Sequence, residues 1–344
     1  MKNIGEIVGN FNKIEELFFE QTTENIIQLA NMVCSEIYGE KVFLRGLIEF
    51  SNQCNANCLY CGIRKENKNI PRYTMTNEEI FEVVKKGYES GLKTFVLQSG
   101  ENNTTLSHRN LCNLTTEIKK HFSDIAITLS CGYFNKTQLK NLKDAGVDRY
   151  LIRFEVADEK IYTYQKNGEK LSKRIEMLYN SKELGFETGS GFMVGLPGET
   201  DLVLLQNLKL CYDLNLDMVG IGPFIPHPAT TLKNATLQPL EKTLKMVALL
   251  RILLPYSNIP ATTAAGSIDI LGREKMLSSG ANVLMPNITP IKYKQNYVLY
   301  PNKICINENG FGCIKCLEKR VTAIKKEISF EIGTSKNFNR RIPK

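Results

Sequence analysis

Short apolar runs rich in β-branched residues alternate with segments of helical periodicity along most of this 344-residue chain. Such alternation is typical of a parallel sheet, because each crossover between parallel strands needs a helix-sized connection. Eight such units predict an α/β fold, a (β/α)8 barrel of the TIM type, whose chemistry lies at the carboxyl ends of the strands. A doubly wound open sheet is the structural rival. The expected strands are residues 42–50, 93–100, 125–130, 149–155, 188–197, 218–225, 259–264 and 281–286.

The clearest helix candidate is the segment 76–91. Thr76 and Glu79 form a capping box at its start, and apolar residues recur at helical spacing behind them. We expect the same kind of helix after most strands, with one near the C-terminus closing the series. The further helix candidates are residues 137–146, 172–185, 200–215, 240–254, 272–280 and 316–327.

We expect one domain in three parts. Residues 1–43 read as a helical extension packed on the barrel, and residues 44–300 form the barrel itself. Residues 301–344 form a C-terminal segment that carries a separate group of cysteines and belongs to the same domain. No shift to a linker-like composition interrupts the series of units.

The bulk numbers exclude several classes of protein. The net charge is +8, but no dense Lys/Arg run contains aromatic residues, so we expect no nucleic-acid binding. The charge can belong to a solvated surface or to the mouth of a site for an anionic ligand. The N-terminus lacks an apolar signal-peptide core, and no apolar run approaches ~18 residues, so we expect no membrane partner and a cytoplasmic protein. There, the ten cysteines predict metal sites and core packing rather than disulfides.

Three cysteines, Cys54, Cys58 and Cys61, directly follow the first expected strand. A structural zinc site normally has four ligands, and a [4Fe–4S] cluster usually takes four thiolates. The local set stops at three, so one iron of such a cluster would keep an open position for a small molecule. These cysteines therefore lie where a barrel enzyme carries its chemistry, and the pattern favours a metal cluster over three unrelated loop residues.

A second set, Cys305, Cys313 and Cys316, follows the last expected strand. It can form a partial zinc site, a staple within a loop, or an accessory [2Fe–2S] or [4Fe–4S] cluster with an open or foreign fourth position. Its distance from the strands argues against a direct role in chemistry. The remaining cysteines fall singly within helix or strand patterns and are interpreted as packing residues: Cys34, Cys112, Cys131 and Cys211.

The CxxxCxxC motif after the first strand of a barrel resembles that of the radical S-adenosylmethionine (SAM) superfamily. In that superfamily, SAM chelates the fourth iron of a [4Fe–4S] cluster, and electron transfer cleaves it to a 5′-deoxyadenosyl radical. The sequences SGE at 99–101, RFE at 153–155 and GFMVGLP at 191–197 resemble further superfamily elements. The resemblance assigns catalysis to the three cysteines and implies these SAM-binding residues: Tyr60, Gln98, Ser99, Gly100, Glu101, Arg153, Glu155, Arg174 and Met193. Without it, SGE is a plain turn and RFE a structural ion pair.

The whole chain is similar to the HydE family of [FeFe]-hydrogenase maturases, through segments such as IEFSNQCNANCLYCGIRKENKNIPRY, DMVGIGPFIPHP and the second cysteine set. This resemblance implies assembly of the diiron subcluster of the hydrogenase, with an iron–cysteine complex carrying CO and cyanide as substrate. It also implies an electron donor such as ferredoxin or flavodoxin and contacts with other maturases. The residues expected to line the substrate cavity are Met218, Thr262, Thr263, Met285, Tyr297 and Tyr300. The alternative for the methionines is core filling, and for the tyrosines a cap on the barrel.

The sequence departs from the family pattern at Phe154 and Val156, where the family has His and Thr, and in the segment 162–174. These departures put the substrate in question and keep three alternatives open. The first is a HydE-like paralogue that acts on another small substrate. The second is an enzyme similar to biotin synthase or methylornithine synthase, which the second cysteine set disfavours. The third is a non-catalytic iron–sulfur scaffold or carrier, which would need no SAM site.

Overall fold

The computed structural model describes residues 4–102 and 104–341. Six parallel strands form the main sheet in the order β2-β3-β4-β5-β6-β8, which is the order of the chain. Neighbouring strands pair in register, as in Leu97 beside Leu129. The six strands are β2 (Gly46–Ser51), β3 (Thr94–Ser99), β4 (Ala126–Ser130), β5 (Arg149–Leu151), β6 (Glu187–Ser190) and β8 (Met218–Val219).

Isolated parallel bridges close this sheet into a barrel. Met218 of β8 bridges to Asn258, Pro260 bridges to Val283 of β10 (Val283–Leu284), and Asn287 bridges back to Leu47 of β2. Residues 258–260 and 283–287 therefore take the places of the seventh and eighth barrel strands, here called staves. With them, the described strands form a closed ring. This confirms the α/β barrel that the sequence predicts and excludes the doubly wound sheet.

Several expected strands are divided or shortened. The expected strand 42–50 forms two strands, β1 (Lys41–Leu44) and β2, because β1 pairs with β10 and β11 (Glu327–Ser329) while β2 pairs with β3. The fifth and sixth strands each continue as a short second piece, β7 (Met193–Val194) and β9 (Gly222–Pro223), and these pieces pair with each other above the barrel.

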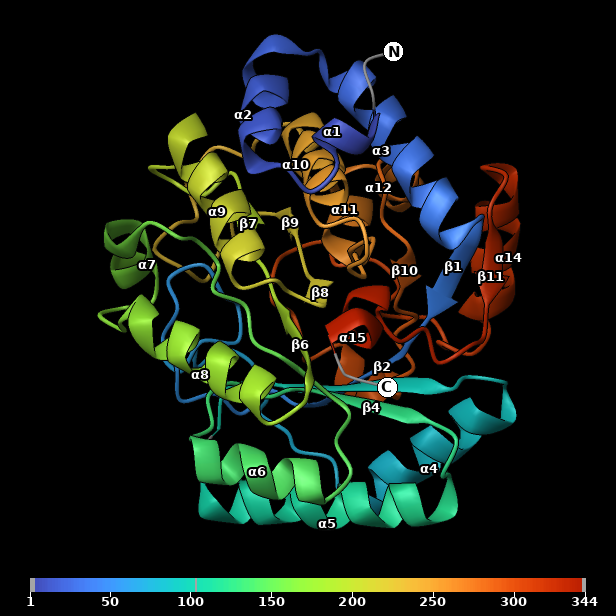
Figure 1. Cartoon of the computed structure of the whole chain (residues 1–344). Coiled ribbons are helices and arrows are strands. Elements are labelled where there is room, and N and C mark those ends of the chain that lie inside the picture. The colour runs from blue at the N-terminus through green and yellow to red at the C-terminus, as the bar shows by residue number, and fades with distance from the viewer. Residues whose placement is uncertain (1–3, 103, 342–344) are drawn as a thin grey trace.

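Helices surround the barrel, with α4, α5 and α6 along one side and α9, α10 and the N-terminal helices along another (Figure 1). The capping box of Thr76 and Glu79 starts α4 as predicted. The helices after the strands are α4 (Asn77–Glu89), α5 (Thr105–His121), α6 (Lys136–Asp144), α7 (Glu159–Gln165), α8 (Leu171–Glu183), α9 (Asp201–Asp213), α10 (Leu240–Leu253), α11 (Thr263–Ile268), α12 (Gly272–Ser278), α13 (Ile291–Lys294), α14 (Cys313–Ala323) and α15 (Lys336–Arg341). None of the helices in the part of the chain that the structure describes has the length and apolar character needed to cross a membrane.

The N-terminal helices cover α10. They are α1 (Ile4–Ile7), α2 (Phe11–Glu20) and α3 (Thr23–Tyr38), and α3 packs along α10. Eight consecutive residues of α10, Met246 to Leu253, are buried, which is expected of a helix that lies between a barrel and a second helix layer. The helical extension thus completes the hydrophobic core on this side.

The C-terminal segment covers the floor of the barrel, where the strands begin. The carbonyl oxygen of Ile332 accepts hydrogen bonds from Thr94 Oγ1 (2.8 Å) and Arg149 (3.0 Å), and that of Gly333 accepts from Arg45 (3.2 Å) and Asn258 (2.8 Å). The amide of Ser335 donates to Glu187 (3.0 Å). These bonds satisfy backbone groups of residues 332–335 that would otherwise be buried without partners.

The floor is held by a buried ion pair between Arg149 and Glu187 (2.5 Å), whose side chains are 1% and 3% exposed. Replacing Glu187 with alanine leaves Arg149 buried without this counter-charge, so Glu187→Ala should lower the free energy of unfolding by roughly 3–5 kcal/mol. Urea denaturation followed by circular dichroism measures this. The control is Glu331→Ala, which removes the exposed pair with Lys41 and should cost at most ~1 kcal/mol. Equal effects of the two substitutions would contradict the structural importance of the buried pair.

Candidate active site

The first cysteine set lies in the loop after β2, at the carboxyl end of the barrel, as the sequence predicts. The loop is held from two directions: the amide of Leu59 donates to Gln165 O (2.8 Å), and the amide of Gly62 donates to Leu299 O (2.9 Å). Cys58 is buried, and Cys54 and Cys61 are half-buried. Burial raises the pKa of the Cys54 and Cys61 thiols, and the neighbouring Cys58 raises both further. The ionisation of the Cys54 and Cys61 thiols therefore depends on the charge at Cys58.

Two glycines allow the close packing around this loop. A Cβ on Gly100 would lie 2.8 Å from Cys54 Cβ and 2.4 Å from Gln53 O, so only glycine fits where β3 ends beside the cysteine loop. A Cβ on Gly62 would lie 2.4 Å from His227 Nε2. His227 accepts the amide hydrogen of Ala229 at Nδ1 (3.0 Å), so the turn that carries it is fixed. The backbone of the loop is thus packed directly against the end of β3 and the loop after β9.

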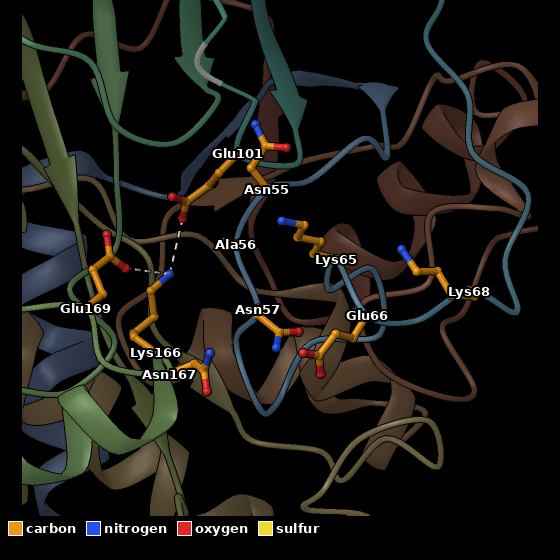
Figure 2. A pocket seen from close by; sticks show the side chains of 10 residues that line it. All are labelled: Asn55, Ala56, Asn57, Lys65, Glu66, Lys68, Glu101, Lys166, Asn167 and Glu169. Atoms are coloured by element: carbon orange, nitrogen blue, oxygen red, sulfur yellow. Dashed lines mark hydrogen bonds and ion pairs between the residues drawn. The ribbon is translucent and has the colours of Figure 1, made fainter.

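A charged network lies beside the loop. Glu101 accepts from Arg174 (2.5 Å) and Lys166 (3.2 Å), and Glu169 pairs with the same two cations (3.1 and 3.3 Å). Lys166 also donates to Cys58 Sγ (3.1 Å). Figure 2 shows Lys166 between the two carboxylates, at the edge of a groove of about 510 Å³. The groove is lined by Asn55, Ala56, Asn57, Lys65, Glu66, Lys68, Glu101, Lys166, Asn167 and Glu169.

These contacts determine the charge of the network. Burial by itself would raise the pKa of Glu101, but the charges of Arg174 and Lys166 outweigh it and lower that pKa to about 2. The pKa of Lys166 is raised by Glu101 and Cys58, against the effect of its burial. Glu101 is therefore ionised and both cations are protonated at neutral pH.

The interior of the barrel contains a cavity of about 330 Å³ that extends from Cys61 to Arg45 near the floor. Most residues expected to bind SAM or substrate line it, while Cys54, Cys58 and Gly100 lie outside its lining and Tyr297 is buried behind it. The expected residues that line the cavity are Tyr60, Cys61, Gln98, Ser99, Glu101, Arg153, Glu155, Arg174, Met193, Met218, Thr262, Thr263, Met285 and Tyr300.

Glu155 has a strained backbone at the wall of this cavity. Its φ is 67°, in the left-handed region that side chains other than glycine rarely adopt. Its amide donates to Gly191 O and its carbonyl accepts from Met193, both at 2.9 Å, so the strand beyond β6 holds it in place. The Glu155 carboxylate lies 2.9 Å from Arg153, whose Nε has no hydrogen-bond partner among the described residues. Strain of this kind clusters at functional sites.

Comparison with known proteins agrees with this geometry. Residues 48–211 match the Radical SAM superfamily. The [FeFe] hydrogenase maturase subunit HydE of Thermotoga maritima is 46% identical over 313 residues, which cover 91% of this chain and 89% of that protein. The chain belongs to the HydE family of radical SAM enzymes. Superfamily members use a [4Fe–4S] cluster and SAM, so the recognition, enzyme class and cofactor class expected from the sequence are confirmed.

Solved structures share the fold of this HydE family member. A methylornithine synthase superposes with a TM-score of 0.83 over 95% of this chain and 96% of that chain, at 23% identity. The [FeFe]-hydrogenase maturase HydG from Carboxydothermus hydrogenoformans superposes with a TM-score of 0.78 over 93% of this chain and 76% of that chain, at 21% identity. At these identities the superpositions show that the closed barrel is common to all three proteins.

Sequence reasoning missed several charged residues of the site. Arg45 and Glu49 interrupt the apolar run 42–50, and this interruption was the signal that could have identified them. Both line the cavity, as does Lys303, which forms a short ion pair with Glu49. Lys166 lies in a segment without any recognisable motif, and only the fold brings it to Cys58.

The second cysteine set is only partly assembled. Cys305 and Cys313 lie close together with Glu308, which the sequence analysis did not select. Cys316 is exposed, one turn further along α14. Among the cysteines expected to pack, Cys34, Cys131 and Cys211 are buried and Cys112 is half-buried.

The charged network gives a prediction that depends on pH. In Glu101→Gln, two buried cations share Glu169 alone, so the free energy of unfolding should fall by roughly 1–3 kcal/mol at pH 7. The folded-state pKa of about 2 is below the usual 4.5, so the stabilisation is complete above pH ~4.5 and is lost as the pH falls toward 2. Denaturant titrations of both proteins between pH 7 and pH 3 measure this. A difference that stays constant with pH would show that Glu101 does not stabilise through its charge.

Proposed function

We propose that this protein is a radical SAM enzyme of [FeFe]-hydrogenase maturation that acts on an iron–cysteine complex carrying CO and cyanide. The observation that carries the proposal is the continuous cavity from Cys61 to Arg45, which is lined by most of the residues proposed to bind SAM. The HydE relative supplies the biological role. A scaffold or carrier of clusters would need no such enclosed cavity, so this alternative is disfavoured.

The residues of the first loop fit a [4Fe–4S] cluster. Cys54, Cys58 and Cys61 offer three thiols, Lys166 compensates anionic charge at Cys58 (3.1 Å), and Gly100 leaves room at Cys54. Held by these thiolates, a reduced cluster would supply the one electron needed to break the C5′–S bond of SAM into methionine and a 5′-deoxyadenosyl radical. The protein holds the loop rigid through its bonds to residues 165 and 299.

SAM would occupy the upper part of the cavity. Arg153 and Arg174 provide guanidinium groups suited to a carboxylate, and Glu155 provides an acceptor for ribose hydroxyls or for the amino group. Gly191 allows its own backbone to lie close to that of Gly220, since a Cβ on Gly191 would lie 2.0 Å from Gly220 O. The remaining residues proposed for SAM are Tyr60, Gln98, Ser99, Gly100, Glu101 and Met193.

The lower cavity suits an anionic substrate. The other cations that line the cavity already have a carboxylate partner: Arg174 pairs with Glu101, Arg153 with Glu155, and Lys303 with Glu49. Arg45 faces Glu187 at 3.9 Å and has a buried Nε without a hydrogen-bond partner in the described residues. Burial and the nearby Arg149 lower the pKa of Arg45 to about 9, which leaves it protonated at pH 7. A bound anion would relieve this unfavourable burial.

Two of the positions that depart from the family pattern, Phe154 and Val156, leave the lining of the cavity unchanged. Phe154 and Val156 are fully buried and absent from the cavity lining, and Phe154 stacks on Phe192 with ring centroids 5.9 Å apart. The exchange of His and Thr for apolar residues therefore changes core packing. The proposed substrate contacts are Met218, Thr262, Thr263, Met285 and Tyr300, with Tyr297 supporting the wall from behind.

Several further features complete the proposal. Cys305, Cys313 and Cys316 hold an accessory iron–sulfur cluster away from the cavity. An electron donor such as ferredoxin or flavodoxin is proposed to dock at the groove beside the first cysteine loop, whose lining includes Lys65 and Lys68 as well as Glu66. Other maturases exchange substrate or product with the protein in the cytoplasm. The segments 1–43, 44–300 and 301–344 are proposed to work as one domain, in which the helices α1 to α3 cover the barrel and residues 332–335 close its floor.

Reductive cleavage of SAM tests the proposal. The protein is reconstituted anaerobically with iron and sulfide, reduced with dithionite and given SAM, and 5′-deoxyadenosine is quantified by chromatography. The wild type should form it, and Cys58→Ala should lose it because a cluster ligand is missing. Cys211→Ala is the control, since Cys211 is buried in α9 away from the loop. Product from Cys58→Ala, or none from a fully loaded wild type that binds SAM, would refute the mechanism.

Glu155 gives a second test that measures binding instead of turnover. If its carboxylate makes a charged hydrogen bond to SAM, Glu155→Ala should weaken SAM binding by roughly 1.5–3 kcal/mol. Isothermal titration calorimetry of the reconstituted protein measures the affinity. Glu176→Ala, which removes an exposed carboxylate of α8, is the control and should bind SAM normally. Unchanged affinity in Glu155→Ala would leave Glu155 as a structural partner of Arg153.

A further inference from the structure

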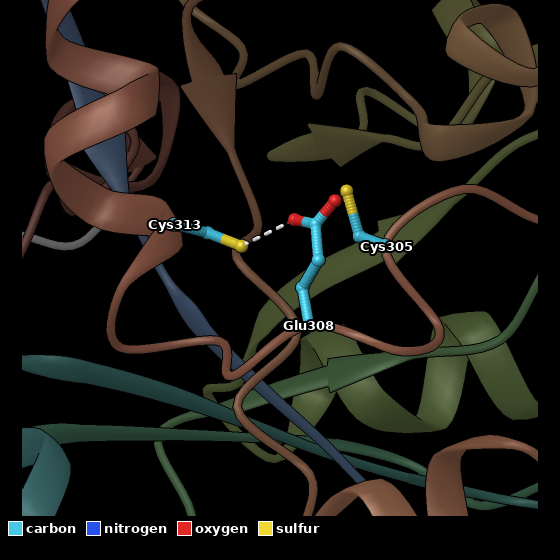
Figure 3. Close-up of side chains that lie close together, drawn as sticks. All are labelled: Cys305, Glu308 and Cys313. Carbon is cyan, nitrogen blue, oxygen red and sulfur yellow. Dashed lines mark hydrogen bonds between the residues drawn. The ribbon is translucent and has the colours of Figure 1, made fainter.

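The loop between α13 and α14 carries an acidic residue between two cysteines. In Figure 3, the Glu308 carboxylate lies between Cys305 Sγ and Cys313 Sγ. The three ligand atoms are all within 4.8 Å of one another. The Cys313 thiol donates to Glu308 Oε2 (3.0 Å). A proton shared between a thiol and a carboxylate occupies a position that a metal ion can take.

The barrel holds this loop in place. Lys294 donates to the carbonyl oxygens of Glu308 (2.8 Å) and Asn287 (2.9 Å), which ties the loop to the eighth stave. A Cβ on Gly310 would lie 2.0 Å from Asn287 O, so the loop backbone packs directly on that stave. Cys305 has a φ of 62°, a strained conformation for a residue other than glycine. Glu308 is thus held at the cysteines by its backbone.

The surroundings favour a negatively charged group at this site. Cys313 is the first residue of α14, at the positive end of the helix dipole. Lys294 is buried beneath the loop, and its ammonium group donates to Glu308 O (2.8 Å). The helix end and the Lys294 ammonium group can compensate the negative charge of a carboxylate ligand.

We propose that Glu308 is the oxygen ligand of the accessory cluster, completing the set of Cys305, Cys313 and Cys316. The inference rests on the accessory cluster of the proposed function. In the assembled cluster, Glu308 would hold iron through a carboxylate oxygen, a harder ligand than thiolate, and the other three protein ligands would be the cysteines. The protons of the three thiols would be released to solvent.

The test isolates the accessory cluster. Cys54, Cys58 and Cys61 are all replaced by alanine in the full chain, so that iron bound after reconstitution belongs to the C-terminal site. This background protein is labelled with 13C-glutamate, reduced and studied by pulsed electron paramagnetic resonance. The expected result is a 13C hyperfine coupling from a ligating carboxylate. Glu308→Ala should lose that coupling and shift the g values, because the oxygen ligand is gone.

Two matched variants complete the design. Glu308→Cys should retain the cluster, lose the 13C coupling and show the spectrum of a site with four thiolates. Glu318→Ala removes an exposed glutamate of α14 and should leave the spectrum unchanged. Circular dichroism verifies that each variant is folded.

The possible failures are distinct. A cluster whose coupling and g values are unchanged in Glu308→Ala would overturn the role of Glu308 and leave the proposed function intact. A background protein that binds no iron would overturn the accessory cluster and the ligand proposal together. Neither result bears on SAM cleavage by the intact protein, which depends on the first cysteine set.

Discussion

The charged cluster around Glu101 connects the parts of the molecule that must meet for function. Glu101 follows β3, while Lys166 and Arg174 both belong to the crossover between β5 and β6, and Lys166 also reaches Cys58. Two crossovers of the barrel thus meet at this carboxylate, and Lys166 connects them to the cysteine loop. In a largely buried setting, these charges are stable only together, so the geometry of the loop is coupled to the correct closure of the barrel.

Much of this arrangement follows from the sequence. The eight apolar runs predicted the closed barrel, because parallel strands are buried on both faces and read as continuous apolar segments. The spacing of Cys54, Cys58 and Cys61 after the first run predicted their place at the carboxyl end of the strands, where the structure puts them. Family resemblance then selected residues that mostly line the cavity, with Gly100 and the buried Tyr297 as exceptions outside its lining.

Other features depend on contacts between residues far apart in the chain. Lys166 is 108 positions from Cys58, and Glu308 became notable only when its loop folded between Cys305 and Cys313. The sharp break at Arg45, which divides the first strand into β1 and β2, results from different pairing partners above and below it. Local patterns cannot reveal such pairings, although a charge inside an apolar strand indicates that something must compensate it.

The segment that covers the barrel floor closes the lower end of the cavity. Arg45 and Asn258, which line the cavity, both donate to the carbonyl of Gly333, so the deepest part of the lumen abuts the C-terminal chain. The floor end of the cavity is therefore closed by backbone, and a molecule held near Arg45 would lie behind a molecule held near Cys61. If both are bound, the deeper one would have to enter before the shallower one.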